Sequence, residues 1–93
     1  MFSVVWGAKA HRDVDGIADY ISRDNPAAAD RITDLIFEAA AGLGVYTRQY
    51  RAGREPGTRE MVVLSNYILI YRIDLDAIRI LRVLHSARQY PPE

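Results

Sequence analysis

The sequence predicts a single two-layer α+β domain over residues 1–93, with an N-terminal strand and a helical hairpin packed on an antiparallel sheet. Three observations lead to this fold class. A short β-branched segment opens the chain, two segments with helical spacing of apolar residues follow, and three β-rich runs joined by tight turns come last. The 93 residues, 49% of them hydrophobic, are enough for one domain with a modest core.

The first strand is expected at residues 2–6, which are apolar and β-branched at their centre and are followed by Gly7. A helix is expected from Ala8 to Asp24, because apolar residues recur there every three or four positions. Charged residues lie mainly on the other side of this helix, so one face should be buried. The apolar stripe consists of Ala10, Val14, Ile17, Ala18 and Ile21.

Asn25 and Pro26 predict the end of this helix and the start of another. Proline disfavours helical geometry in the residue before it, and it suits the first position of a helix that an asparagine caps. The second helix is expected from Pro26 to about Leu43, with Gly42 and Gly44 as stop signals. The short link predicts an antiparallel helical hairpin.

The C-terminal half predicts a three-strand meander. Its β-rich runs cover residues 59–64, 67–73 and 77–84, and turn-forming residues separate them. Breaks this short join antiparallel neighbours. Residues 45–56 are expected to form a loop rich in arginine and tyrosine, and the first strand is expected to join the meander beside a neighbour that the pattern leaves open.

Composition restricts the class of protein. The chain has no cysteine, which excludes disulfides and thiolate metal sites, and no motif in it predicts a metal or another cofactor. No apolar run approaches the roughly 20 residues that span a bilayer, and the N-terminus does not resemble a secretory signal. A soluble cytoplasmic protein with no membrane partner is therefore expected.

Charge is distributed unevenly along the chain, although the net charge is zero. Residues 1–40 carry four basic and seven acidic side chains, whereas residues 41–93 carry eight basic and five acidic ones. This split is compatible with an anionic partner for the basic half, or with two solvated faces.

The last strand is expected to present its polar residues on different faces. Alternate residues of a strand point to opposite faces. In a regular strand, Arg82 would share a face with Ile80, and His85 would share the opposite face with Val83. Arg82 and His85 could line one simple site only if the strand ended or bulged before His85.

Several segments, taken together and in this order, are characteristic of one family. They are Gly53-Arg54, residues 56–60, the run from Tyr67 to Arg72, residues 81–85, and Arg88, Tyr90 and Pro91. With them, the chain resembles the RelE/ParE superfamily of bacterial toxins from type II toxin–antitoxin modules. The resemblance covers nearly the whole chain, the order of elements is that of the family, and the final segment is closer to the ParE branch than to RelE.

The resemblance implies a toxin that is neutralised by a cognate ParD-like antitoxin, whose C-terminal segment lies over the helical hairpin and a sheet edge. Unpaired strand edges favour strand addition, which supports this arrangement. DNA would be contacted only indirectly, through the antitoxin. The apolar hairpin residues expected to contact the antitoxin are Ile17, Ile21, Ile32, Leu35 and Ile36.

Two activities occur in this superfamily, and one fold supports both. ParE-like members bind DNA gyrase and block it with cleaved DNA, whereas RelE-like members cut messenger RNA in the ribosome. The ParE-like last segment favours a gyrase inhibitor without chemistry of its own. RelE-like nucleases rely on lysines in this region, whereas the only lysine of this chain, Lys9, is on the first helix, which favours the same choice. The residues expected to contact the target are Arg54, Arg59, Arg82, His85, Arg88 and Tyr90.

The alternative is a ribosome-dependent endoribonuclease, which needs a base, an acid and cations for the phosphate charge. Its catalytic residues would be Arg59, His85, Arg88 and Tyr90. Histidine is the side chain that titrates nearest neutral pH, so His85 is a candidate base, and Glu60 is another. A third hypothesis is a degenerate toxin that acts only in an autoregulatory complex with its antitoxin.

Overall fold

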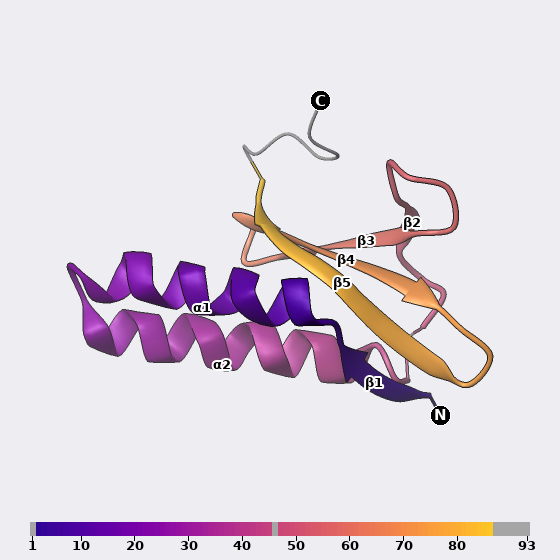
Figure 1. Cartoon of the computed structure of the whole chain (residues 1–93), viewed down its shortest axis with the longest axis horizontal. Coiled ribbons are helices and arrows are strands. Elements are labelled where there is room, and N and C mark those ends of the chain that lie inside the picture. The colour runs from indigo at the N-terminus through magenta and orange to yellow at the C-terminus, as the bar shows by residue number, and fades with distance from the viewer. Residues whose placement is uncertain (1, 46, 87–93) are drawn as a thin grey trace.

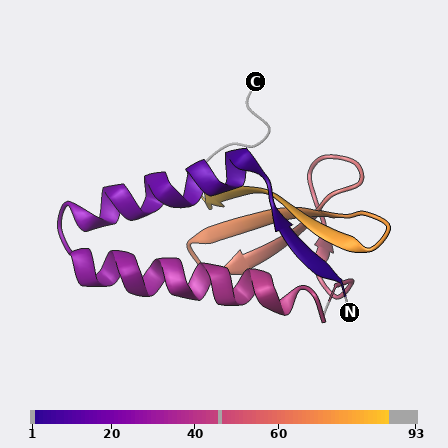
Figure 2. The same ribbon diagram turned by 60° about the horizontal axis from the view of Figure 1, so that its bottom comes forward.

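A helical hairpin lies along one face of a five-stranded sheet in the computed structural model, which describes residues 2–45 and 47–86 (Figures 1 and 2). This arrangement confirms the predicted α+β class. In chain order the elements are β1 (Ser3–Trp6), α1 (Ala8–Ser22), α2 (Pro26–Gly42), β2 (Arg51–Ala52), β3 (Arg59–Val63), β4 (Tyr67–Ile73) and β5 (Ala77–His85).

The strand order in the sheet is β1-β5-β4-β3-β2. β3, β4 and β5 form the predicted antiparallel meander. β1 pairs in parallel with the first four residues of β5, so the sheet is mixed and its first strand lies beside the last. The residues of β2 were expected to be part of a loop, but both of them pair with β3. The Gly53 N–H donates to the Thr58 carbonyl at 2.7 Å and so closes the turn between the two strands.

The helix boundaries follow the predicted signals closely. α1 ends at Ser22, two residues before the expected end, and α2 begins at Pro26. The Asn25 side chain accepts a hydrogen bond from the Ala28 N–H at 3.1 Å, as its role as helix cap requires. The helix ends at Gly42, one residue before the expected end, but neither Gly42 nor Gly44 adopts the left-handed conformation of a glycine stop signal.

The main core lies between the hairpin and the sheet. Ala10 and Val14 of α1 and Ile36 of α2 pack there on sheet residues that include Leu69 and Ile80. Burying side chains of the larger kind stabilises the fold by roughly 1.5–3 kcal/mol each. This packing explains why both predicted apolar stripes are needed to form the two layers.

A bulge interrupts the pairing of β4 with β5. The adjacent residues Ile70 and Tyr71 of β4 lie opposite Arg82 and Ile80 of β5, which leaves Leu81 as the extra residue. The sequence pattern gives no sign of it, because Leu81 is apolar like the neighbours that it follows.

The bulge changes which residues of β5 face the helices. Ile80 and Val83 both lie in the core beneath the helices, whereas regular alternation would place them on opposite faces. The prediction that Arg82 shares a face with Ile80 is therefore wrong, because Arg82 pairs with Ile70 on the side away from the helices. His85 shares the helix-facing side with Val83, because it pairs with Tyr67, which packs against the core beneath the helices.

Candidate functional site

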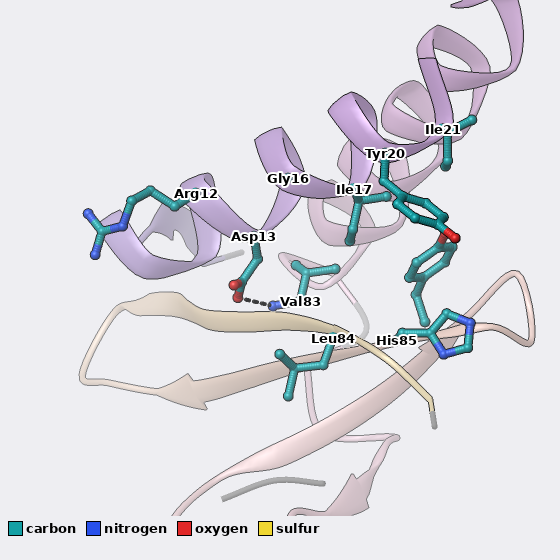
Figure 3. Close-up of a pocket in the computed structure, with 10 residues that line it drawn as sticks. Arg12, Asp13, Gly16, Ile17, Tyr20, Ile21, Val83, Leu84 and His85 are labelled. Atoms are coloured by element: carbon teal, nitrogen blue, oxygen red, sulfur yellow. Dashed lines mark hydrogen bonds between the residues drawn. The ribbon is translucent and has the colours of Figure 1, made fainter. Parts of the chain in front are cut away.

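A groove of about 620 Å³ runs between α1 and the C-terminal half of β5 (Figure 3). It brings together Ile17 and Ile21, two predicted antitoxin contacts, with His85, a predicted target contact. The remaining lining residues are Arg12, Asp13, Gly16, Tyr20, Tyr67, Val83 and Leu84.

The groove exists because β1 is shorter than β5. The pairing of β1 ends with Trp6 opposite Ile80, and Gly7 N–H then donates to the Ile80 carbonyl at 2.9 Å. A Cβ atom at Gly7 would lie 3.0 Å from that carbonyl oxygen, so the close approach favours glycine. The chain then turns into α1, and residues 81–85 of β5 have no neighbouring strand on this side among the described residues.

Asp13 occupies the position that a longer β1 would have filled. Six helical residues after Gly7 advance about 9 Å, and three strand residues after Ile80 advance about 10 Å, so Asp13 comes level with Val83. Its carboxylate accepts a hydrogen bond from the Val83 N–H at 3.0 Å, as Figure 3 shows. This contact closes one position of the open strand edge.

Arg82 is held by the same carboxylate. Its Nε donates to one oxygen of Asp13 at 2.7 Å and its Nη2 donates to the other at 3.0 Å. Both side chains are largely buried, with 17% of Arg82 and 12% of Asp13 exposed. Arg82 was predicted to contact the target, and the structure places its guanidinium in an ion pair that joins the hairpin to the sheet.

His85 lies at the exposed end of the groove. Its ring contacts Tyr67 edge to face, with ring centroids 5.7 Å apart. The Ser86 N–H donates to the Asn66 carbonyl at 2.7 Å, which continues the pairing past the end of β5 and positions the histidine. Tyr20 of α1, which is 73% exposed, lines the same groove. The groove thus offers an imidazole and two phenols on an apolar floor.

A second groove of about 500 Å³ lies between α2 and β3. β2 pairs only with the first two residues of β3, so the rest of this edge has no strand beside it in the described residues. The Thr58 carbonyl accepts the Gly53 N–H on this side of β3, and alternate residues of an antiparallel strand face the same edge, so the main-chain groups of Val62 face this edge too. Leu35 and Val62, which are 37% and 52% exposed, line it. Leu35 is a predicted antitoxin contact.

Arg59 and Glu60 fasten the segment between α2 and β3. Arg59 donates to the main-chain carbonyls of Tyr50 at 2.8 Å and Arg48 at 3.2 Å. The Glu60 carboxylate is 3% exposed and accepts from the Arg51 side chain at 3.1 Å. Arg59 was predicted to contact the target or to serve as a catalytic residue, and Glu60 was a candidate base. Both make contacts that hold the fold.

The remaining predicted residues are distributed as follows. Arg54 lies in the turn after β2, where its N–H donates to Glu60 at 3.0 Å. Ile32 is half-buried against the core, and Ile36 is fully buried in it, so Ile36 presents no surface to a partner. Arg88 and Tyr90 lie outside the described residues.

Asp13, Tyr20 and Tyr67 are the residues of this site that sequence reasoning missed. Asp13 was assigned to the solvent face of the first helix, but it lies one turn before Ile17 on the same side. That spacing is the signal that could have identified it. No signal indicated Tyr20 or Tyr67, because their proximity depends on how the hairpin lies on the sheet.

Neither a metal site nor a membrane span is found in the described part of the chain. No group of three or more His, Asp or Glu side chains there is placed to hold a metal ion. No described helix is both long enough and apolar enough to cross a bilayer.

Comparisons with known proteins agree on one kind of protein. Residues 4–90 match the family described as ParE toxin of the type II toxin–antitoxin system parDE. The chain is 40% identical over 87 residues to the protein Y4kP of Sinorhizobium fredii, covering 92% of this chain and 90% of the relative. It is 34% identical over 88 residues to toxin RelE2 of Caulobacter vibrioides, covering 95% of this chain and 99% of the relative.

Two solved structures share the fold of this chain. The chain is similar to a structure described as the chromosomal ParDE TA system from P. aeruginosa, with a TM-score of 0.81 and 27% identity over 91% of this chain and 96% of that one. A Helicobacter pylori protein, HP0894, shares the fold with a TM-score of 0.62 at 14% identity, over 95% of this chain and 98% of that one.

Proposed function

Because the chain belongs to the ParE toxin family of type II toxin–antitoxin systems, we propose that it inhibits DNA gyrase by binding and is neutralised by a cognate ParD-like antitoxin. The toxin acts without covalent chemistry of its own. One observation carries this choice: two of the side chains that a nuclease would use, Arg59 and Glu60, are engaged in holding the fold.

The engaged residues are those of the sheet and its loop. The guanidinium of Arg82 is paired with Asp13, that of Arg59 donates to main-chain carbonyls, and Glu60 is buried against Arg51. A general base must reach the proton that it removes, and a phosphate clamp must present open donors. Glu60 and Arg82 do neither, and Arg59 is tied to the loop carbonyls through one of its nitrogens, which favours recognition of a protein target over cleavage.

A supercoiling assay tests the activity. Relaxed plasmid, gyrase and ATP are incubated with the purified chain, and the products are then treated with detergent and protease. We expect supercoiling to fall and linear plasmid to accumulate as the toxin concentration rises, and the cognate antitoxin to restore supercoiling. Unchanged supercoiling together with normal growth after expression without the antitoxin would contradict the proposal and favour a degenerate toxin.

Cleavage of messenger RNA is the second candidate function, and His85 is the observation that favours it. This imidazole is exposed at the rim of the groove and contacts Tyr67, so a base and a phenol lie together there. Translating ribosomes with a defined message test it directly. If the message is cut while gyrase is unaffected, and His85→Ala abolishes the cut whereas His11→Ala does not, the nuclease function replaces gyrase inhibition.

The antitoxin is proposed to occupy the two grooves that flank the hairpin. Each groove combines apolar helix residues with an open strand edge, and the relevant helix residues are Ile17 and Ile21 in one and Leu35 in the other. Such edges bind an extended chain through main-chain hydrogen bonds, while neighbouring pockets take its side chains. Ile36 is left out of this surface because it is fully buried.

Charged substitutions on the hairpin test this surface. Ile21→Asp and Leu35→Asp should each weaken antitoxin binding by at least about tenfold in calorimetry, because a charge enters an apolar contact. Ala27→Asp, at an exposed position on the first turn of α2, is the matched control. Equal affinities for all three variants would mean that the antitoxin binds elsewhere.

A further inference from the structure

The sheet face turned away from the helices carries two arginines that lie side by side. Arg72 and Arg79 are direct neighbours on β4 and β5. Both point away from the helices, because the adjacent residues Tyr71 and Ile80 lie in the core beneath them. Like charges placed opposite each other destabilise a sheet unless an anion lies between them. Asp74 provides that anion, accepting from the Nε of Arg72 at 2.9 Å and from the Nε of Arg79 at 3.3 Å.

This cluster has donors for a second anion. Each guanidinium has five N–H groups, and the contact with Asp74 uses only Nε. The other nitrogens of Arg72 and Arg79 make no hydrogen bond with the described residues, and the two side chains are 47% and 42% exposed. Pairs of such N–H groups bind a phosphate in bidentate geometry.

A second cluster of the same composition lies on the same face. Glu60 is opposite Ile70, on the side away from the helices, and it pairs with Arg51 at 3.1 Å and with Arg54 at 3.5 Å. Asp74 follows Ile70 by four residues, so the two clusters are about 13 Å apart along the strands. Two pairs of arginines at a fixed separation, each pair sharing one carboxylate, suit a polymer with regularly spaced anions.

The opposite side of the molecule is acidic. The hairpin covers the other face of the sheet, as Figure 2 shows. A protein of zero net charge with one basic and one acidic side is oriented by a polyanion, which attracts the first and repels the second. The exposed acidic residues of the hairpin are Asp15, Asp19, Asp24, Asp30, Asp34 and Glu38.

We propose that this arginine face, formed by Arg51, Arg54, Arg72 and Arg79, binds the phosphodiester backbone of DNA. A phosphate binds on the solvent side of Arg72 and Arg79, and Asp74 holds the two guanidiniums in place while competing with it. This site goes beyond gyrase inhibition, and it rests on the proposed function only for the choice of DNA as the polymer. It departs from the expectation that DNA is reached only through the antitoxin.

Fluorescence anisotropy with a labelled DNA duplex at low salt tests the proposal on the purified chain. Arg72→Gln/Arg79→Gln should weaken binding by about tenfold, because two phosphate donors are lost. Arg23→Gln/Arg31→Gln removes the same charge from exposed positions on the hairpin and should change affinity less than about twofold. The affinity of the wild-type chain should fall steeply with salt concentration, because counterions are released from the phosphates.

A third substitution, which should raise the affinity for DNA, distinguishes binding at this site from general electrostatic attraction. Asp74→Asn removes the competing charge, and it should tighten binding about threefold more than Asp76→Asn, which alters charge equally in the same turn. Equal effects in each charge-matched pair would overturn the proposal. Competition by polyglutamate as strong as that by DNA would overturn it too, in favour of an acidic protein surface. DNA binding that is lost in the double arginine variant supports the site even if gyrase is unaffected, so the two proposals fail separately.

Discussion

Asp13 and Arg82 join the first helix to the last strand through a two-pronged ion pair, with Nε and Nη2 of the arginine 2.7 and 3.0 Å from the two carboxylate oxygens. The same carboxylate accepts the Val83 N–H. The pair lies just beyond the point where the pairing of β1 with β5 ends, and the Asp13 carboxylate binds a β5 N–H that a longer β1 would have bound. Asp13 also lines the groove in which the antitoxin is proposed to lie.

Asp13→Ala is expected to lower the free energy of unfolding by about 2–4 kcal/mol, because a largely buried guanidinium and a strand N–H lose their acceptor together. Urea denaturation measures this change. Asp15→Ala, two residues along the same helix and exposed, should change stability by less than about 0.5 kcal/mol. The double variant Asp13→Ala/Arg82→Ala should recover part of the loss, giving a coupling energy of about 1–3 kcal/mol. Additive single effects would mean that the ion pair contributes nothing of its own.

Much of the fold could be predicted because each signal is local. The helix cap at Asn25 and the start at Pro26 depend on residues within one turn, and the apolar stripes depend on spacing within one helix. The meander follows from short breaks between β-rich runs. These features do not require knowledge of distant contacts, and the structure reproduces them within two residues at the helix ends.

The site could be predicted only in part, because it depends on contacts between distant elements. The bulge at Leu81 sets which residues of β5 face the hairpin, and nothing in the local pattern marks it. The parallel pairing of β1 with β5 decides where the groove opens. Asp13 meets Arg82 across 69 positions of sequence, and such an encounter is not visible in spacing.

Asp74 should make stability depend on acid pH. Its hydrogen bond from Arg72, with a further one from Arg79, lowers the pKa of the carboxyl below its usual 3.8. A lowered pKa stabilises the folded chain at pH values above the ordinary pKa of the carboxyl. This stabilisation is lost as the pH falls through the pKa of the folded state. Urea midpoints measured on both sides of pH 4 should therefore fall more for the wild type than for Asp74→Asn. Asp76→Asn should follow the wild type, and a parallel decline of all three proteins would contradict the assignment.

Tyr71 links the centre of the sheet to the end of the hairpin. Its hydroxyl donates to the Thr47 carbonyl at 2.8 Å, and the Thr47 hydroxyl donates to the Leu43 carbonyl at 2.8 Å. Tyr71→Phe should lower stability by about 1 kcal/mol, because a buried carbonyl loses its donor. Tyr20→Phe, on an exposed ring, should have no measurable effect in the same thermal unfolding experiment.

The same tyrosine predicts an alkaline response. Burial raises the pKa of Tyr71 above its usual value of 10.0, against a smaller opposing effect of Arg59. The unfolded chain then loses this proton first, so stability should fall as the pH rises above 10. Tyr71→Phe should show a shallower decline than the wild type over that range, when denaturant midpoints are compared. An equal decline would assign the alkaline response to the other tyrosines.

Glu60→Gln should loosen the turn that carries Arg54. The carboxylate is 3% exposed and receives the Arg54 N–H at 3.0 Å and the Arg51 side chain at 3.1 Å. Neutralising the carboxylate weakens its charge-assisted hydrogen bonds. Because both arginine side chains are partly solvated, the loss of stability should be only about 1–2 kcal/mol. In hydrogen-exchange measurements the Arg54 amide should exchange faster than in the wild type. Binding to gyrase should also weaken if Arg54 contacts this target. Glu38→Gln, exposed on α2, is the matched control, and an Arg54 amide that exchanges equally slowly in both variants would show that Glu60 does not hold this turn.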